Sequence, residues 1–215
     1  MALKSLSSQR KLAYLYLVVN TICWGASLVL TKPAFDITTP FRFLFYRYLL
    51  ATALFGLPYL VINKTKLKWD QIKTIVLLEL LGTVINLTIL YVGLNLTSAI
   101  EASLIGTTGP VFITLAGIFF LKEKQEGHEW VGLSLSLIGT LLVVMTNHGR
   151  TNQISLTGNL LVVSYNILNA VYLILAKKYY HQLSKTLVGA VSFITGLVSM
   201  FFILLFLNQL QLGSI

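Results

Sequence analysis

Arg47, Glu79 and Glu101 interrupt long apolar segments of this 215-residue sequence, and they are the side chains best suited to chemistry. A charge in apolar surroundings is costly, so each must have a partner, water or a function. Arg47 could anchor a solute carboxylate or act as a gate charge, or it could be a structural arginine that extends to a polar surface. Either glutamate could carry a coupling proton. The alternatives are that Glu79 caps against Lys73 and that Glu101 is hydrated.

One polar stripe follows helical spacing through an otherwise apolar segment. Glu79, Gly82, Thr83 and Asn86 stand at positions i, i+3, i+4 and i+7. In a regular helix this spacing puts all four on one face. A stripe of this kind predicts a helix that faces a cavity or another helix.

Two other segments each combine aromatic rings with side-chain amides. Asn20, Trp24 and Ser27 share one helical face, and Asn169 and Tyr172 have similar spacing in a later segment. Rings offer contact area and amides orient a small solute, which predicts a binding pocket. The alternative is that these residues form interfacial aromatic belts and helix–helix hydrogen bonds.

Pro110, preceded by Gly109, interrupts a further apolar segment near its middle. Proline removes a backbone hydrogen bond, so it predicts a kink with a freed carbonyl. Thr107 and Thr108 could bond that backbone or reach the pocket. The candidate solute-binding residues are therefore Asn20, Trp24, Ser27, Asn86, Thr107, Pro110, Asn169 and Tyr172.

The composition explains why these polar residues are conspicuous. Hydrophobic residues make up 56% of the chain and charged residues only 11%, against roughly 25% charged residues in a soluble domain. The single cysteine, Cys23, excludes an internal disulfide. Soluble enzymes, nucleic-acid-binding proteins and secreted disulfide scaffolds are thereby disfavoured, and an integral membrane protein in contact with the lipid bilayer is favoured.

Apolar runs of helix length predict an all-α, multi-span membrane bundle. The seven predicted spans are residues 12–30, 41–62, 75–94, 99–121, 130–146, 158–176 and 187–207. Short connections with turn residues separate them, and the third and fourth spans must form an antiparallel hairpin. Gly132, Ser136 and Gly139 form a small-residue seam in the fifth span, which predicts close packing or a homodimer.

Charge predicts the orientation of these spans. The net charge is +9, and twelve of the sixteen basic residues fall on one side when the spans are laid out alternately. Positive residues accumulate in cytoplasmic loops. We therefore expect a multi-pass protein of the plasma (inner) membrane with a cytoplasmic N-terminus.

The sixth span looks like an inverted restart of the first. An offset of 145 residues pairs Leu30 with Leu175 and Lys32 with Lys177, and the predicted topology puts the two lysines on opposite sides. Mirrored repeats are common in transporters, because two halves can rock around a central site. Residues 1–150 would be one five-helix repeat, and residues 151–215 the start of a second.

The order and spacing of five sequence blocks resemble the EamA-type branch of the drug/metabolite transporter (DMT) superfamily. The blocks are Trp24–Ser27, Phe45–Ala51, Tyr91–Leu94, Thr107–Phe112 and Trp130–Gly132. The resemblance implies ten helices in two inverted repeats, and seven of those helices are present here. The position that pairs with Trp24 in the second repeat is Asn169, which departs from the family's pattern. We expect that the 215-residue chain alone shows no transport, and that it continues into three more helices or assembles with itself or a partner.

The sequence therefore predicts a secondary transporter that moves a small organic solute (a metabolite, an amino acid or a drug-like molecule) by alternating access, driven by a proton or solute gradient. The alternative is a non-transporting membrane protein: a scaffold, a receptor-like protein or an inactive fragment. An enzyme is disfavoured, because no phosphate loop or catalytic triad is present. The three histidines, His128, His148 and His181, fall in loops on differing sides. We therefore predict neither a metal nor a cofactor.

Overall fold

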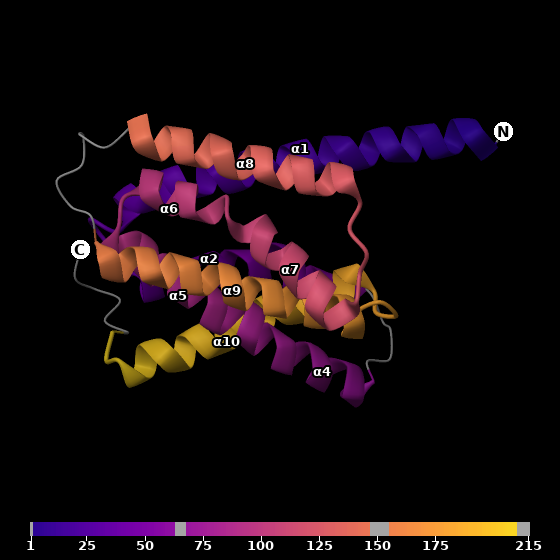
Figure 1. Ribbon diagram of the computed structural model, residues 1–215. Helices are drawn as coiled ribbons and strands as arrows, with labels where there is room; N and C mark the ends of the chain where they lie inside the picture. Colours follow the sequence, from indigo (N-terminus) through magenta and orange to yellow (C-terminus); the bar gives the residue numbers. More distant parts are fainter. Residues whose placement is uncertain (1, 63–67, 147–154, 210–215) are drawn as a thin grey trace.

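The computed structural model describes residues 2–62, 68–146 and 155–209, and these residues contain helices and no strand (Figure 1). Side chains are described except at positions 2–9, 136 and 140–146. The elements in chain order are α1 (Ala2–Ala34), α2 (Pro40–Ala51), η1 (Thr52–Gly56), α3 (Leu57–Ile62), α4 (Trp69–Glu79), η2 (Leu80–Ile85), α5 (Asn86–Leu96), α6 (Ala99–Gly106), α7 (Gly109–Leu121), α8 (Gly127–Thr146), α9 (Leu156–Tyr179) and α10 (Lys185–Phe206).

Six continuous helical stretches are long and apolar enough to cross a membrane. They are Arg10–Ala34, Pro40–Ile62, Trp69–Leu96, Ala99–Leu121, Leu156–Tyr179 and Lys185–Phe206. The predicted multi-span, all-α membrane fold is thus confirmed. The predicted fifth span lies in α8, where the seam residue Ser136 falls outside the described side chains.

Hydroxyl side chains begin several of these helices. Thr39 Oγ accepts a hydrogen bond from the Arg42 amide at 3.4 Å, and Pro40 occupies the first turn of α2. Ser98 and Ser155 begin α6 and α9 in the same way, each accepting from an amide three residues ahead at 3.1 Å. Capping satisfies amides that have no partner within the helix.

The second and third spans each contain a π-helical stretch. The amide of Leu57 bonds to the carbonyl of Thr52, and the amide of Asn86 bonds to that of Leu81, so both bonds reach back five residues. Both stretches, η1 and η2, pack against α10. The regular spacing assumed for the polar stripe therefore does not hold across η2, whose wider turn changes the directions of the side chains.

The predicted kink in the fourth span is present. Helix α6 ends at Gly106, residues Thr107 and Thr108 form a turn, and α7 begins at Gly109. Both threonine hydroxyls bond backbone carbonyls, of Leu104 and Ile105 respectively, at 2.7 Å. Both hydroxyls thus bond carbonyls of the turn before the break, and a role of either threonine in the pocket stays a prediction.

Helix α9 lies in the middle of the bundle, against α5, α6 and α7, while α10 packs on α2 and α4. The main apolar core joins α2, η2, α5, α6, α9 and α10 through Leu44, Tyr48, Val84, Leu90, Tyr91, Leu94, Ala102, Val162 and Met200. In contrast, α1 and α8 lie outside α6, along the top of Figure 1. They are the most peripheral helices of the bundle.

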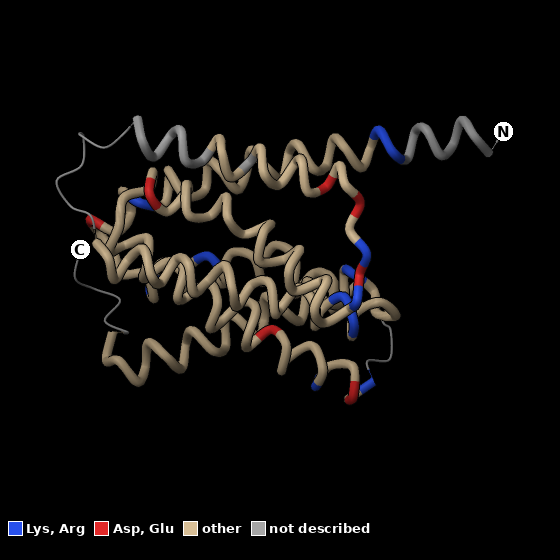
Figure 2. Tube along the Cα trace, viewed as in Figure 1, with Lys and Arg blue, Asp and Glu red and all other residues tan. Residues whose placement is uncertain are grey.

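Basic residues gather at the end of the bundle where α4 begins and α9 ends (Figure 2). At the opposite end, Lys32 and Arg42 bond carbonyls near helix C-termini. Lys32 Nζ donates to the carbonyls of Leu94 at 2.9 Å and Asn95 at 2.7 Å, and Arg42 Nε donates to that of Gln209 at 2.9 Å. Cations are favourable at helix C-termini.

Candidate functional site

The Glu79 carboxylate is the most enclosed acidic group of the described chain, with 1% of its surface exposed. Its Oε1 accepts hydrogen bonds from the hydroxyls of Tyr172 and Tyr180, each at 2.9 Å, and its Oε2 accepts from Ser192 at 2.8 Å. The alternative in which Glu79 caps against Lys73 is wrong, because Lys73 is exposed and the carboxylate faces α9 and α10.

Close packing between η2 and α9 holds this carboxylate in place. A β-carbon at Gly82 would overlap the ring of Tyr172, so only glycine lets the two elements approach this closely. This packing holds the Tyr172 hydroxyl within hydrogen-bond distance of Glu79, which lies one turn before Gly82 in the chain. Tyr48 of α2 closes the other side, where its hydroxyl donates to the Thr83 carbonyl at 2.9 Å.

Asn86 and Asn169 meet deeper in the same bundle. Asn86 Nδ2 donates to Asn169 Oδ1 at 3.3 Å, and Asn86 is 1% exposed. Its Oδ1 is buried and accepts no hydrogen bond from the described residues. Buried polar atoms are almost always paired in proteins, so this oxygen marks a position where a further donor is expected.

Asn166, also on α9, bonds the break between α6 and α7. Its Nδ2 donates to the Ile105 carbonyl at 2.8 Å and to Thr108 Oγ at 3.1 Å. These two bonds tie α9 to the turn between α6 and α7. Pro110 itself is exposed, and so is Thr107.

Arg47 has a protein partner within the bundle. Its Nη1 donates to the Tyr91 hydroxyl, and its guanidinium carbon lies 5.7 Å from the centre of the Tyr91 ring. Tyr91 is fully buried, so this contact fixes the arginine's direction. The bond gives Arg47 a structural role and uses one of its five N–H donors, so a role in binding a solute carboxylate stays a prediction.

Glu101 is half-buried at the start of α6. It accepts a hydrogen bond from Thr97 Oγ, and that oxygen lies 2.6 Å from Asn159 Oδ1 of α9. The carboxylate is thus part of a polar contact between helices, not simply hydrated. Glu101 lies next to the connection between the third and fourth spans, because α6 begins where α5 ends. Glu79 lies toward the other end of the third span.

The candidate residues of the first span lie away from these contacts. Asn20 and Trp24 are exposed on α1, Trp24 by 39%, and Ser27 is intermediate. Helix α1 packs against α6 and α5. The structure thus brings together Asn86, Asn169, Tyr172 and Glu79 but leaves the α1 face outside that group, so a pocket that includes α1 stays a prediction.

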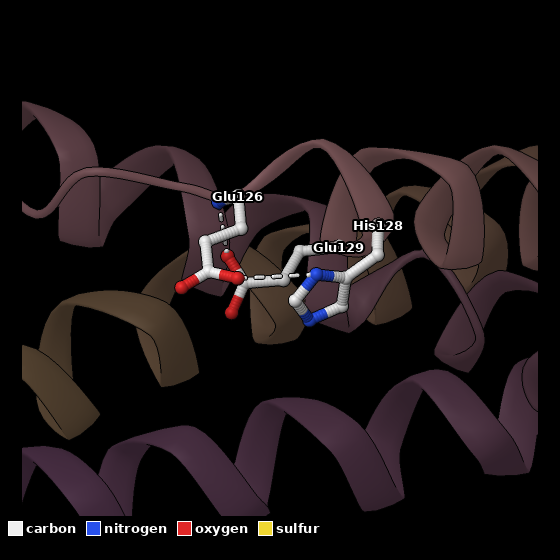
Figure 3. A network of polar contacts seen from close by, with 3 residues as sticks. All are labelled: Glu126, His128 and Glu129. Atoms are coloured by element: carbon white, nitrogen blue, oxygen red, sulfur yellow. Dashed lines mark hydrogen bonds and ion pairs between the residues drawn. The ribbon is translucent and has the colours of Figure 1, made fainter.

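The loop between α7 and α8 has polar contacts of its own (Figure 3). His128 Nδ1 lies 3.2 Å from Glu126 Oε2, and the Glu126 amide donates to Glu129 Oε2 at 2.9 Å. Both members of the His128–Glu126 pair are 76% exposed, and exposed ion pairs contribute little. Among the described residues, no group of three or more His, Cys, Asp or Glu side chains is placed to hold a metal.

Sequence analysis missed Tyr180, Ser192 and Asn166. Asn166 stands three residues before Asn169, a helical spacing that could have indicated it. Tyr180 follows the end of α9 and Ser192 is a single hydroxyl in an apolar run, so neither had a local signal. Only the tertiary packing brings them to Glu79.

A multi-pass helical bundle with a carboxylate and paired amides in its interior defines a class of membrane proteins that handle polar solutes or ions. Residues 11–145 match the EamA-like transporter family, and the chain belongs to this family. The family is a transporter family, which agrees with the class defined by the fold.

Individual relatives also carry the word transporter in their names. The uncharacterized inner membrane transporter YhbE of Escherichia coli K12 is 27% identical over 151 residues, 66% of this chain and 46% of the relative. An uncharacterized transporter of Archaeoglobus fulgidus is 25% identical over 189 residues, 86% of this chain and 64% of the relative. The uncharacterized transporter YoaV of Bacillus subtilis is 26% identical over 144 residues, 66% and 49% respectively.

The chain spans about half the length of YhbE and YoaV. No solved structure shows a significant match.

Proposed function

We propose that this protein is a secondary transporter of a small, polar organic solute that works by alternating access. The observation that carries the proposal is the Oδ1 of Asn86, which has no donor among the described residues and is buried beside Asn169 in the interior of a membrane bundle. Side-chain amides orient polar ligands, so this pair suits a small solute that can donate a hydrogen bond to that oxygen.

Three further proposals follow from the sequence. The N-terminus is cytoplasmic in a plasma (inner) membrane, the sixth span (α9) restarts the first in inverted orientation, and the face of α8 that carries Gly132 and Gly139 is available for a homodimer. The end-to-end difference in basic residues supports the orientation. At both glycines an added β-carbon would have nothing within 4 Å, which supports an open α8 face.

Transport is tested in cells. The metabolites inside and outside cells are compared for the wild-type gene, the Asn86→Leu gene and no gene. We expect one polar solute to change its distribution with the wild-type gene and to return to the empty-cell distribution with Asn86→Leu at equal membrane level. Identical metabolites in all three would favour the non-transporting alternative.

Orientation has its own test in a Cys23→Ala background. Ile37 is 89% exposed in the turn after α1, and His181 is exposed after α9. We expect Ile37→Cys to react with an impermeant maleimide in intact cells and His181→Cys to react only after permeabilisation. The reverse pattern would refute both the orientation and the inverted repeat built on it.

A further inference from the structure

The Glu79 carboxylate accepts three hydroxyl hydrogen bonds and has no cation beside it. Within the described residues, the ion pairs closer than 4.0 Å are His128–Glu126 and Lys177–Glu123, and neither involves Glu79. A buried acidic group without a counter-ion is costly when ionised. The three hydroxyls therefore have to stabilise whatever charge it carries.

The groups that face Glu79 come from three elements. Helix α9 provides Tyr172 and Tyr180, α10 provides Ser192, and α2 provides Tyr48, whose hydroxyl is used on the Thr83 carbonyl. All are neutral hydroxyls.

Glu79 is ten residues after the start of α4 at Trp69, or about 15 Å along the axis. Tyr180, half-buried, follows the end of α9 that carries Lys177 and Lys178, so its hydroxyl links the carboxyl to the basic end of the bundle.

A π-helix begins at the residue after Glu79. The Thr83 hydroxyl donates to the Glu79 carbonyl at 2.6 Å, inside the wider turn of η2. Single π-helical turns within α-helices are frequent at functional sites. This is a second feature, independent of the carboxylate, that marks the same position.

We propose that Glu79 is a proton-binding site, and that its protonation changes how α9 and α10 are held against the junction of α4 and η2. An ionised carboxylate accepts all three hydroxyls, whereas a neutral acid is itself a donor and has one strong acceptor oxygen. Because Oε1 already accepts both tyrosines, the proton would sit on Oε2, and the Ser192 hydroxyl would change there from donor to acceptor. Only the use of this proton in transport rests on the proposed function; the binding site stands without it.

The test measures proton binding directly, by infrared difference spectra of the purified 215-residue chain in lipid nanodiscs over a pH series. The chain has seven acidic residues, so the carbonyl band of protonated carboxylic acids is expected to have several components as the pH falls. We expect one titrating component, shifted by the buried hydroxyl contacts, to be lost in Glu79→Gln. Glu101→Gln is the matched control and should keep that component. A Glu79→Gln spectrum with the same titrating components as the wild-type chain would overturn the proposal.

Donor variants keep the proposal testable if Glu79→Gln does not fold. Tyr180→Phe and Ser192→Ala each remove one hydroxyl from the carboxylate, and each should move the midpoint of the titration. Tyr48→Phe removes a hydroxyl that bonds elsewhere and should leave the midpoint within error. Equal shifts of the titration midpoint in all three variants would overturn the assignment of Glu79 as the proton-binding group.

The infrared readout does not depend on flux. Absence of a transported solute together with a normal titration would count against the proposed function and leave the proton site intact. Solute transport without a titration at Glu79 would support the proposed function and overturn the proton site.

Discussion

Helices α1 and α9, paired by the 145-residue offset, have opposite environments. Each combines an apolar face with amide and aromatic side chains, and Leu30/Leu175 and Lys32/Lys177 are identical pairs. Yet α9 is the central helix and buries residues at every turn, whereas most large apolar side chains of α1 between Leu12 and Leu30 are exposed, and Leu28 alone of these packs against the main core. Similar sequence character therefore does not dictate burial.

The neighbours of α9 explain the difference. Gly82 and Gly93 bring η2 and α5 against it, so polar groups on α9 reach partners on other helices. A β-carbon at Gly25 of α1 would meet nothing within 4 Å. Close approach through small residues, more than the polar pattern, decides which helix enters the core.

The largest effect is expected from Gly158→Ala on α9. The added β-carbon would lie 2.9 Å from backbone atoms of Leu96 and Thr97, which cannot turn aside. Overpacking of this kind costs about 1–3 kcal/mol, measured as the loss of unfolding free energy in mild detergent. Gly25→Ala is the control on α1, and a comparable loss there would remove the contrast between the helices.

The next effect concerns side-chain amides. Asn166→Leu on α9 removes the donor to the Ile105 carbonyl, and interhelical hydrogen bonds in membranes contribute about 0.6–2 kcal/mol. Asn20→Leu on α1 removes an exposed amide and should not destabilise the fold. Denaturation in SDS–detergent mixtures measures both. Destabilisation by Asn20→Leu would mean that α1 has a partner in the membrane.

Lys32 on α1 and Lys177 on α9 extend the comparison of the two helices, with a smaller expected change in stability. Lys32→Gln removes a cation from carbonyls at the end of α5, a contribution of about 0.3–1 kcal/mol. Lys177→Gln breaks an exposed pair with Glu123, a contribution of about 0–1 kcal/mol that added salt should screen. Unfolding free energies at low and high salt distinguish the two. An effect of Lys177 that is unchanged by salt would contradict this account.

The smallest change in stability is expected for Trp24→Ala, within about 0.5 kcal/mol, because this side chain is partly exposed. If α1 contributes to the predicted pocket, the variant reduces solute transport at an unchanged melting temperature. The measurement pairs a melting curve with the metabolite comparison described above. Unchanged transport would remove Trp24 from the pocket.

Much of the fold could be predicted from the sequence, because long apolar runs leave few options except membrane helices. The break at Gly109–Pro110 was predicted for the same reason, since proline acts locally. The partners of Glu79 were not, because Tyr180 and Ser192 lie about 100 residues away in the chain. The π-helical stretches also escaped prediction, since Leu80–Ile85 has the composition of an ordinary membrane helix.

The π-helical stretch η1 has a consequence for how sequences of this family are aligned. Its hydrogen bond spans five residues instead of four, so Thr52–Gly56 accommodates one residue more than an α-helical turn would. A relative that lacks one residue here can continue as α-helix and keep Leu57–Ile62 in phase with α2. The same deletion elsewhere in the span would rotate all later side chains by about 100°. A single-residue gap is therefore physically sensible within Thr52–Gly56 and disruptive a turn to either side.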